Sequence, residues 1–311
     1  MKTLIALFLL AASPAQGDSL SVMFWNLENF FDWRDSGAGS SDAEFSSTGE
    51  RRWTKKRFQT KCAAIAKTVF LAADELGGLP DIIGVAEVEN RFVLKCLLED
   101  TPLRRAGYNI VHYDSPDPRG IDVALLYRSA RLDTLRTFPA GVPGVLTRDM
   151  LVAQLRTPRG DSLALIVCHH PSKYGGAAAE PKREAAVSRL QALSDSLIAA
   201  SWTRVAAIGD FNDTPDSPIY ARLEGSLVNL SSEPARKGEG SIRFMGDWEL
   251  IDQCFVSESL SGSALFEVLR PAFLTTHDNA CAGEKPLRTY SGPRYLGGVS
   301  DHYPILVRLH F

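Results

Sequence analysis

The chain has 311 residues, of which 45% are hydrophobic and 23% are charged. This length can bury a sizeable core, and the composition is that of a soluble globular protein, so a disordered chain or a coiled coil is excluded. The formal net charge of −3 at pH 7 excludes a broad basic surface. Any contact with nucleic acid must therefore be local.

The first 17 residues differ from the rest of the chain. Lys2 precedes an apolar stretch at residues 4–12, and a small-residue cleavage site follows at residues 13–15. The apolar stretch is too short to span a bilayer and has the layout of a secretory signal peptide. We therefore predict a signal peptide at residues 1–17, a single α/β domain at residues 18–311, and a secreted or periplasmic protein without stable membrane insertion.

The cysteines do not indicate a zinc site. Their number is odd, and no two share CxxC spacing. Export permits disulfides without requiring them, so the sequence leaves their pairing open. Buried free thiols are expected at three of the five positions, within predicted helices or a strand: Cys62, Cys96 and Cys168.

Apolar strands and amphipathic helices alternate along the chain, which predicts an α/β fold. Residues 34–50 are rich in Ser, Gly and Asp and predict a long exposed loop. The most basic segment, residues 51–57, leads into the first helix. Its side chains are either simply solvated or able to bind a polyanion. The predicted helices are 54–76, 91–99 and 180–199, and the predicted strands are 20–25, 81–86, 108–113, 123–127, 151–155, 163–168, 205–208, 250–256 and 303–309.

Six predicted strand ends carry a polar residue that can bind a metal ion or move a proton. In a layered α/β fold, strand ends that are far apart in sequence can converge on one rim. Each such residue alone is more often a satisfied turn or core polar group, but so many together favour a shared site. The residues are Asn26, Glu87, His169, Asp210 with Asn212, Asp252, and Asp301 with His302.

These residue types indicate phosphoester hydrolysis. The oxygen ligands Asn26, Glu87 and Asp301 suit Mg²⁺ or Mn²⁺. Two histidines at strand ends can act on a water and an oxyanion near neutral pH. The sequence has no HExxH motif, Walker loop or GxSxG motif, which disfavours a zinc protease, nucleotide-driven phosphoryl transfer and serine esterase chemistry.

The order of the motifs resembles the endonuclease/exonuclease/phosphatase superfamily, which includes DNase I-like nucleases. The similar segments cover nearly all of the chain after residue 17, and they combine a GDFN motif with a terminal SDH motif. They are residues 25–29, 85–90, 122–127, 169–172, 209–212, 251–252 and 300–304. The resemblance implies a four-layer α/β sandwich, with two mixed β-sheets packed face to face and helices outside.

The resemblance also implies a role for each site residue. Asn26, Glu87 and Asp301 match the metal ligands of the family, and the expected cofactor is Mg²⁺ or Mn²⁺. The remaining matches are catalytic. Asp210 and Asn212 match the residues that orient the attacking water and contact the phosphate, His302 matches a histidine paired with Asp252, His169 matches the one that stabilises the phosphoryl oxygens, and Asp122 matches the acid that orients His169.

The substrate is less clear from the sequence. Glu28 and Glu89 lie two residues beyond motif residues and are able to face the same cleft, where an acidic mouth repels a polyanion. We predict that Arg119, Lys173 and Asn212 bind the substrate. Other basic residues that can compensate are Arg51, Arg52, Lys55, Lys56, Arg288 and Arg294.

We therefore predict a monomeric, metal-dependent enzyme that hydrolyses phosphodiester bonds, with nucleic acid as the main candidate substrate. The alternative within the family is a phosphomonoesterase or phospholipid hydrolase acting on an inositol phosphate or a sphingomyelin-like head group. Members that act on membranes would carry an exposed aromatic hairpin, and none is obvious in the sequence. A third alternative is a non-catalytic binding module, which the full set of charged site residues disfavours.

Overall fold

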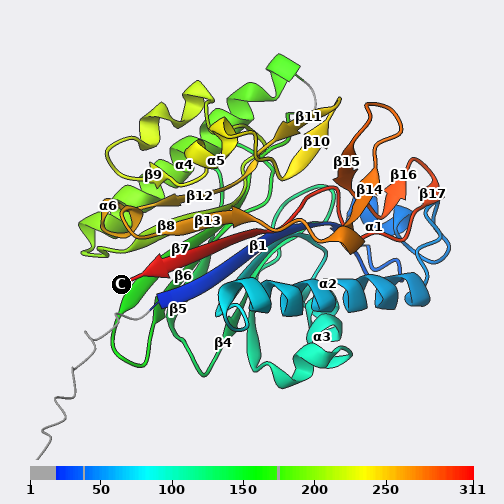
Figure 1. The fold of residues 1–311 in the computed structure, drawn as a ribbon, viewed down its shortest axis with the longest axis horizontal. Coiled ribbons are helices and arrows are strands. Elements are labelled where there is room, and N and C mark those ends of the chain that lie inside the picture. The colour runs from blue at the N-terminus through cyan, green and yellow to red at the C-terminus, as the bar shows by residue number, and fades with distance from the viewer. Residues whose placement is uncertain (1–18, 38, 174–175) are drawn as a thin grey trace, which may run out of the picture.

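The computed structural model describes residues 19–37, 39–173 and 176–311, so the predicted signal peptide lies outside the described residues. Two six-stranded mixed sheets pack face to face (Figure 1). The first sheet has the order β13 (Leu265–Val268), β18 (Ile305–His310), β1 (Ser19–Phe30), β2 (Ile82–Val88), β4 (Asp122–Arg128), β3 (Tyr108–His112). The second has the order β5 (Asp133–Ala140), β6 (Met150–Arg156), β7 (Ser162–His169), β8 (Val205–Asp210), β12 (Asp252–Val256), β9 (Val228–Asn229).

Helices and short hairpins complete the chain. Parallel pairing is restricted to β1 with β2 and β7 with β8 among the strand pairs of the two sheets. The α-helices are α1 (Ser40–Glu44), α2 (Lys55–Leu76), α3 (Arg91–Glu99), α4 (Glu180–Ala199), α5 (Ser232–Arg236) and α6 (Glu258–Ser261). Three hairpins pair β10 (Ile242–Phe244) with β11 (Asp247–Glu249), β14 (Thr275–His277) with β15 (Glu284–Pro286), and β16 (Tyr290–Ser291) with β17 (Arg294–Tyr295).

Strand β1 is apolar on both faces because it lies between two layers. Val22 and Phe24 pack into the core between the two sheets. Met23 and Trp25 point to the other face, where they pack with α2 and α3. This alternation follows from the two-residue period of a strand. The four-layer α/β sandwich predicted from the sequence is confirmed.

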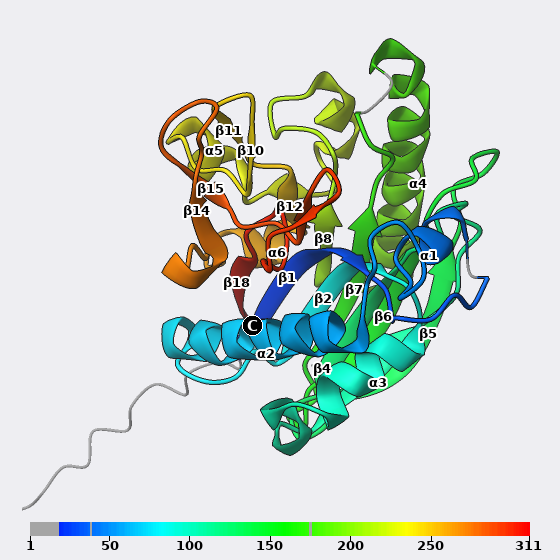
Figure 2. The same cartoon turned by 90° about the vertical axis from the view of Figure 1, so that its right-hand side faces the viewer.

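The helices form the outer layers (Figure 2). Phe58 and Ile65 of α2 are buried against the first sheet, and Val187 and Leu190 of α4 against the second. Helix α2 begins after Thr54, whose side chain accepts the N–H of Arg57, and ends at Gly77 in a left-handed conformation. These local capping signals explain why the predicted bounds of α2 agree with the structure to within one residue. The predicted bounds of α3 and α4 agree as well, although the N-cap residue of α4, Ala179, makes no side-chain capping hydrogen bond.

The segment at residues 34–50 was expected to be an exposed loop, and this expectation is only partly right. It contains α1, and Asp42 is fully buried there, where it accepts hydrogen bonds from the main-chain N–H and the hydroxyl of Ser36. The basic segment after it is used for packing. Arg57 donates hydrogen bonds to the carbonyl oxygens of Arg51 and Arg52 and lies 4.3 Å from the ring centroid of Tyr295.

All five cysteines are free. Cys62 and Cys168 are buried as expected, and burial raises the pKa of both thiols, which keeps them protonated and unreactive. Cys96, which was expected to be buried as well, is instead partly exposed, while Cys254 is buried and Cys281 is exposed. No helix within the described residues is long and apolar enough to cross a membrane.

Gly209 permits the close approach of β7 and β8 at the end where both strands carry site residues. A Cβ atom at Gly209 would overlap the carbonyl oxygen of Cys168 on the neighbouring strand. Gly209→Ala must therefore push the two strands apart. We expect it to lower the free energy of unfolding by about 1–3 kcal/mol, the usual cost of overpacking, as measured by urea denaturation.

Gly78→Ala is the matched control, because a Cβ atom at Gly78 would meet nothing within 4 Å. Its free energy of unfolding should stay within about 0.5 kcal/mol of the parent value. Equal effects of the two substitutions would contradict the role given to Gly209.

Candidate active site

Three neighbouring strands place three polar residues at the same level of the second sheet. His169 on β7 pairs in register with Asp210 on β8, and Asp210 pairs with Asp252 on β12. Val167 lies two residues before His169 and Ile208 two residues before Asp210, on the same face of the sheet, and both belong to the core between the sheets. The polar side chains therefore continue the inter-sheet face to the rim of the sandwich.

The first sheet contributes Asn26 and Glu87. Asn26 continues the inter-sheet face of β1, two residues after Phe24. Glu87 lies at an irregularity of β2, where the register against β4 shifts between Ala86 and Val88, and its φ is +58°. An added residue of this kind bends the strand and re-aims a side chain, which explains how Glu87 reaches the rim although Ala86 already faces the core.

Left-handed backbone conformations concentrate at this rim. Such values of φ are uncommon for residues other than glycine and each stores strain. Besides Glu87, three residues near the predicted metal and catalytic residues have them: Glu28 (φ 46°), Asn29 (φ 52°) and Asn212 (φ 51°). Since strained backbone persists only where the surrounding structure enforces it, this concentration favours a functional role for the rim.

The segment that carries Asp301 and His302 is fastened to the end of β1. The hydroxyl of Ser300 donates a hydrogen bond to the carbonyl oxygen of Asn26 at 2.6 Å. The indole N–H of Trp25 donates to the carbonyl oxygen of His302 at 2.9 Å. These two contacts join residues about 275 positions apart in the sequence.

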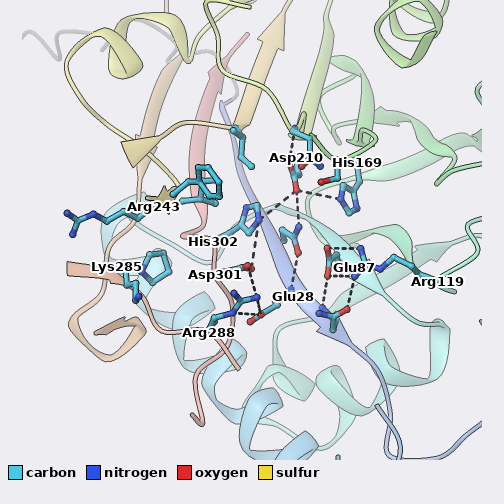
Figure 3. Close-up of a pocket in the computed structure, with 18 of the residues that line it drawn as sticks. Glu28, Glu87, Arg119, His169, Asp210, Arg243, Lys285, Arg288, Asp301 and His302 are labelled. Atoms are coloured by element: carbon cyan, nitrogen blue, oxygen red, sulfur yellow. Dashed lines mark hydrogen bonds and ion pairs between the residues drawn. The ribbon is translucent and has the colours of Figure 1, made fainter. Parts of the chain in front are cut away.

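The side chains meet in one cavity of about 430 Å³ (Figure 3). The cavity lies between the ends of strands from both sheets, with His169 and Arg119 on one side and Arg243 and Lys285 on the other. Eight residues predicted from the sequence line it: Asn26, Glu87, Arg119, His169, Asp210, Asn212, Asp301 and His302.

The buried carboxylate of Asp210 is the centre of the site. Its Oδ2 accepts a hydrogen bond from Asn26 Nδ2 at 2.9 Å and lies 3.5 Å from His169 Nε2 and 3.9 Å from His302 Nε2. Burial, assisted by the negative charge of Asp252, raises the pKa of Asp210 to about 7. Asp210 can therefore gain or lose a proton near neutral pH.

The two histidines have opposite protonation. His302 Nδ1 lies 2.7 Å from Asp252 Oδ2, so the contact expected between these residues is present. Although burial lowers the pKa of His302, the charge of Asp252 and this hydrogen bond raise it well above its usual value. Burial and the nearby charge of Arg148 instead lower the pKa of His169 far below its usual value. His302 is therefore cationic and His169 neutral.

The donor atoms of the site fit a hard divalent cation. Burial raises the pKa of Glu87, but the charge of Arg119 and the N–H of Asn29, which donates to Oε2 at 2.8 Å, lower it overall, so the carboxylate stays anionic. Asn26 and Asp301 line the same cavity and add oxygen donors. Asp210, Asp252 and His302 form a second cluster, with one ligand atom each within 4.8 Å of the others, which is able to hold a metal ion only when His302 is deprotonated.

Three cations of the cavity were missed by the sequence interpretation: Arg148, Arg243 and Lys285. Arg148 is buried, lines the cavity, and donates hydrogen bonds to Asp117 Oδ2 at 3.1 Å and to the carbonyl oxygen of His170 at 2.7 Å. It lies between β5 and β6 in a segment without a motif, so nothing distinguishes it from a surface arginine. Arg119, by contrast, was predicted, and it lies against Glu87 Oε2 at 3.3 Å.

Two predicted residues are placed differently. Asp122 Oδ2 lies 3.0 Å from His112 Nε2, so the prediction that Asp122 orients His169 is wrong. Its strand, β4, belongs to the first sheet, and the neighbouring strand β3 supplies the histidine that it contacts. Lys173 does not line the cavity; its Nζ lies 3.2 Å from both Asp213 Oδ1 and Glu249 Oε2.

The acidic mouth expected from Glu28 and Glu89 is largely neutralised. Glu28 lines the cavity, but its Oε1 accepts hydrogen bonds from Arg288 at 2.7 and 2.9 Å. Glu89 points elsewhere, because it accepts hydrogen bonds from the main-chain N–H of Asp32 and the hydroxyl of Ser36.

Solved structures with the same fold cover nearly the whole chain. The truncated TDP2 of Caenorhabditis elegans is 16% identical with a TM-score of 0.62, over 94% of this chain and 98% of that one. Danio rerio TDP2 in complex with a single-strand DNA product is 14% identical with a TM-score of 0.55, over 94% of this chain and 99% of that one. A mannosyl-6-phosphatase of Bacteroides thetaiotaomicron is 18% identical with a TM-score of 0.57, over 94% of this chain and 100% of that one.

The sequence comparison gives the family. None of the curated proteins searched matches the sequence. A sequence model of the endonuclease/exonuclease/phosphatase family matches residues 21–310, which includes every residue of the cavity. The chain belongs to the endonuclease/exonuclease/phosphatase family.

Proposed function

We propose that this protein is a divalent-cation-dependent hydrolase of phosphodiester bonds, with nucleic acid as its substrate. The observation that carries this proposal is the buried Asp210 carboxylate, which lies beside a cationic His302 and shares its cavity with the oxygen donors Asn26, Glu87 and Asp301. A base, an acid and a set of hard ligands are what in-line attack of water on a phosphate requires.

Each residue has a distinct task in this reaction. An ionised Asp210 accepts a proton from the attacking water, and its pKa of about 7 suits this exchange near neutral pH. His302, kept cationic by Asp252, donates a hydrogen bond to the negative charge that develops on the phosphoryl group. A neutral His169 donates one N–H to the same group. When bound, Mg²⁺ or Mn²⁺ supplies neutralisation of a phosphate oxygen and of the leaving alkoxide.

The cations on both sides of the cavity support a polyanionic substrate. Arg119 lies toward His169, while Arg243 and Lys285 lie on the opposite side (Figure 3). Arg148, which also lines the cavity, donates a hydrogen bond to the carbonyl oxygen of His170, the residue after His169. The TDP2 structure that contains single-strand DNA product is consistent with this choice. We also propose that the protein is a monomer. A further part of the proposal is export through the signal peptide at residues 1–17, which cell fractionation tests.

A phosphomonoester is the second candidate. The cavity volume of about 430 Å³ suits a small substrate, and one structure with the same fold is a mannosyl-6-phosphatase. A substrate panel separates the candidates. Plasmid DNA, RNA and bis(p-nitrophenyl) phosphate should be cleaved with Mg²⁺ and spared with EDTA. Hydrolysis of monoesters alone would favour the second candidate, and hydrolysis of no phosphoester would refute both.

Asp252→Asn removes the charge that keeps His302 protonated. We expect kcat to fall by about 10²- to 10⁴-fold, the usual scale for acid–base groups, and the remaining activity to decline further at alkaline pH. Steady-state kinetics at several pH values and Mg²⁺ concentrations measure this. If raising Mg²⁺ restored activity, Asp252 would instead be a metal ligand within the second cluster.

Glu87→Gln should weaken metal binding, because an amide replaces the anionic ligand. Part of the lost activity should return when Mg²⁺ is raised, since mass action refills a weakened site. Glu89→Gln is the matched control: Glu89 is buried and lies two residues away but does not line the cavity, so the Mg²⁺ dependence should stay that of the parent. Titration of activity with Mg²⁺ compares the two, and an unaltered Mg²⁺ dependence in Glu87→Gln would exclude Glu87 as a ligand.

The pH profile should reflect Asp210. Because its folded pKa is raised to about 7, protonation removes the general base as the pH falls below neutral. We expect kcat/KM to decrease about tenfold per pH unit on this acid limb. The profile of kcat/KM for bis(p-nitrophenyl) phosphate measures it, and a rate that stayed level from neutral pH down to the usual carboxylate range would contradict the role of Asp210.

A further inference from the structure

The β10–β11 hairpin borders the catalytic cavity and exposes apolar side chains at its tip. Phe244 is 60% exposed and lines the cavity, and the next residue, Met245, is 81% exposed without lining it. Met245 and Gly246 both have positive φ, as a two-residue hairpin turn requires. No exposed aromatic hairpin was obvious in the sequence, and this hairpin exposes one aromatic ring, that of Phe244. Strands of three residues are too short to show a period.

A second cavity, of about 560 Å³, lies next to the catalytic cavity. Arg243 lines both, and the adjacent residues of β15 divide between them, with Lys285 in the catalytic cavity and Glu284 in the second. The two cavities therefore share a wall made of β10 and β15.

Arg243 is held in this wall by the main chain. Its Nε donates to the carbonyl oxygen of Gly246 at 3.0 Å and its Nη1 to that of Glu284 at 2.8 Å. Gly283 makes room for the guanidinium, since a Cβ atom there would lie 2.7 Å from Nη1. Among the described residues, none of the ion pairs involves Arg243, so its charge is available to an anion.

The second cavity is also lined by aromatic rings and a second cation. Trp248 pairs in register with Arg243, whose guanidinium lies 5.8 Å from the centroid of the Trp248 ring. The rings of Trp248 and Tyr303 stack with centroids 5.8 Å apart, and the guanidinium of Arg270 lies 4.6 Å from the Trp248 centroid. Arg270 also pairs with Glu239 at 2.8 Å, which leaves Arg243 as the cation better placed to bind a ligand. This cavity suits an anionic ligand that also has a flat face.

We propose that the β10–β11 hairpin, with Phe244 on the catalytic cavity and Arg243 on the wall that both cavities share, binds the nucleotide that adjoins the scissile phosphate. Its phosphate contacts Arg243 and its base stacks on Phe244, so the enzyme acts on a strand of several nucleotides rather than on a small phosphoester. This inference rests on the proposed function. A nucleotide combines a flat aromatic ring with an anion, and the wall presents an exposed aromatic ring next to an unpaired arginine. A lipid surface would instead use Phe244 and Met245 equally, without needing a charged cavity behind them.

The experiment compares three variants on two substrates. Substrates are bis(p-nitrophenyl) phosphate, which has one phosphate, and a labelled single-stranded hexanucleotide. Phe244→Ala should lower the ratio of kcat/KM for the hexanucleotide to that for the small diester by about tenfold, the scale of one lost base stack, and Phe244→Trp should restore it. Arg243→Gln should also lower this ratio. In addition, the slope of log KM for the hexanucleotide against log salt concentration should fall by about one, as expected for the loss of one phosphate contact.

Met245→Ala is the matched control, because Met245 shares the tip and lines neither cavity. It should leave the ratio unchanged. A uniform effect of Phe244→Ala and Arg243→Gln on both substrates would overturn the proposal and make the hairpin purely structural. Equal loss of binding to sphingomyelin and phosphoinositide vesicles in Phe244→Ala and Met245→Ala would overturn it in favour of a membrane contact.

The parent protein separates this inference from the proposed function. If it cleaves the small diester but not the hexanucleotide, the nucleotide site is refuted while phosphodiester hydrolysis stands. If it cleaves neither substrate, the proposed function itself is refuted.

Discussion

The carboxylate of Asp210 is buried at a point where three nitrogen atoms approach one of its oxygens. A buried carboxylate is costly unless it is paired and hydrogen-bonded, so the elements that bring those nitrogens must be held in place. They come from β1, β7 and the segment before β18. The register of β7, β8 and β12 sets the level of His169, Asp210 and Asp252, and the two contacts from Ser300 and Trp25 bring His302 to them.

The free-energy cost of strained backbone at this site is divided among several residues of the rim. Four residues with left-handed φ lie within a few positions of the metal and catalytic residues, and each such conformation costs roughly 1–3 kcal/mol. The strands that carry them are packed on both faces, from the core between the sheets and from the helical layers. This two-sided burial provides the stability that allows a bulged, strained strand end to persist at Glu87.

Glu28 shows how one acid can serve the structure rather than the chemistry. Burial, with a contribution from Asp301, raises its pKa to about 7, while Arg288 and Lys61 act in the opposite direction. Its Oε2 accepts the main-chain N–H of Thr289, and the buried Lys61 donates to Thr289 Oγ1, so β1 and the segment after β15 are tied together. The cleft is consequently less acidic than a count of its carboxylates implies, which favours an anionic substrate.

Local sequence patterns predicted the strands, the long helices and most of the site residues, while the four-layer arrangement was predicted from the resemblance to a known family. Continuous apolar runs predicted buried strands, apolar residues at helical spacing predicted the long helices, and polar residues after the strands predicted a shared rim. These are local patterns with a fixed period, so they can be read along the chain. Three features became visible only in the folded chain: Asp122 contacts His112, Arg148 is a buried cation of the cavity, and a hairpin carries Phe244 to the edge of that cavity. The contacts of a charged side chain are made with residues that come close only when the chain folds, so they cannot be read from local sequence. Strands of two or three residues are too short to show the alternation by which a strand is recognised in a sequence.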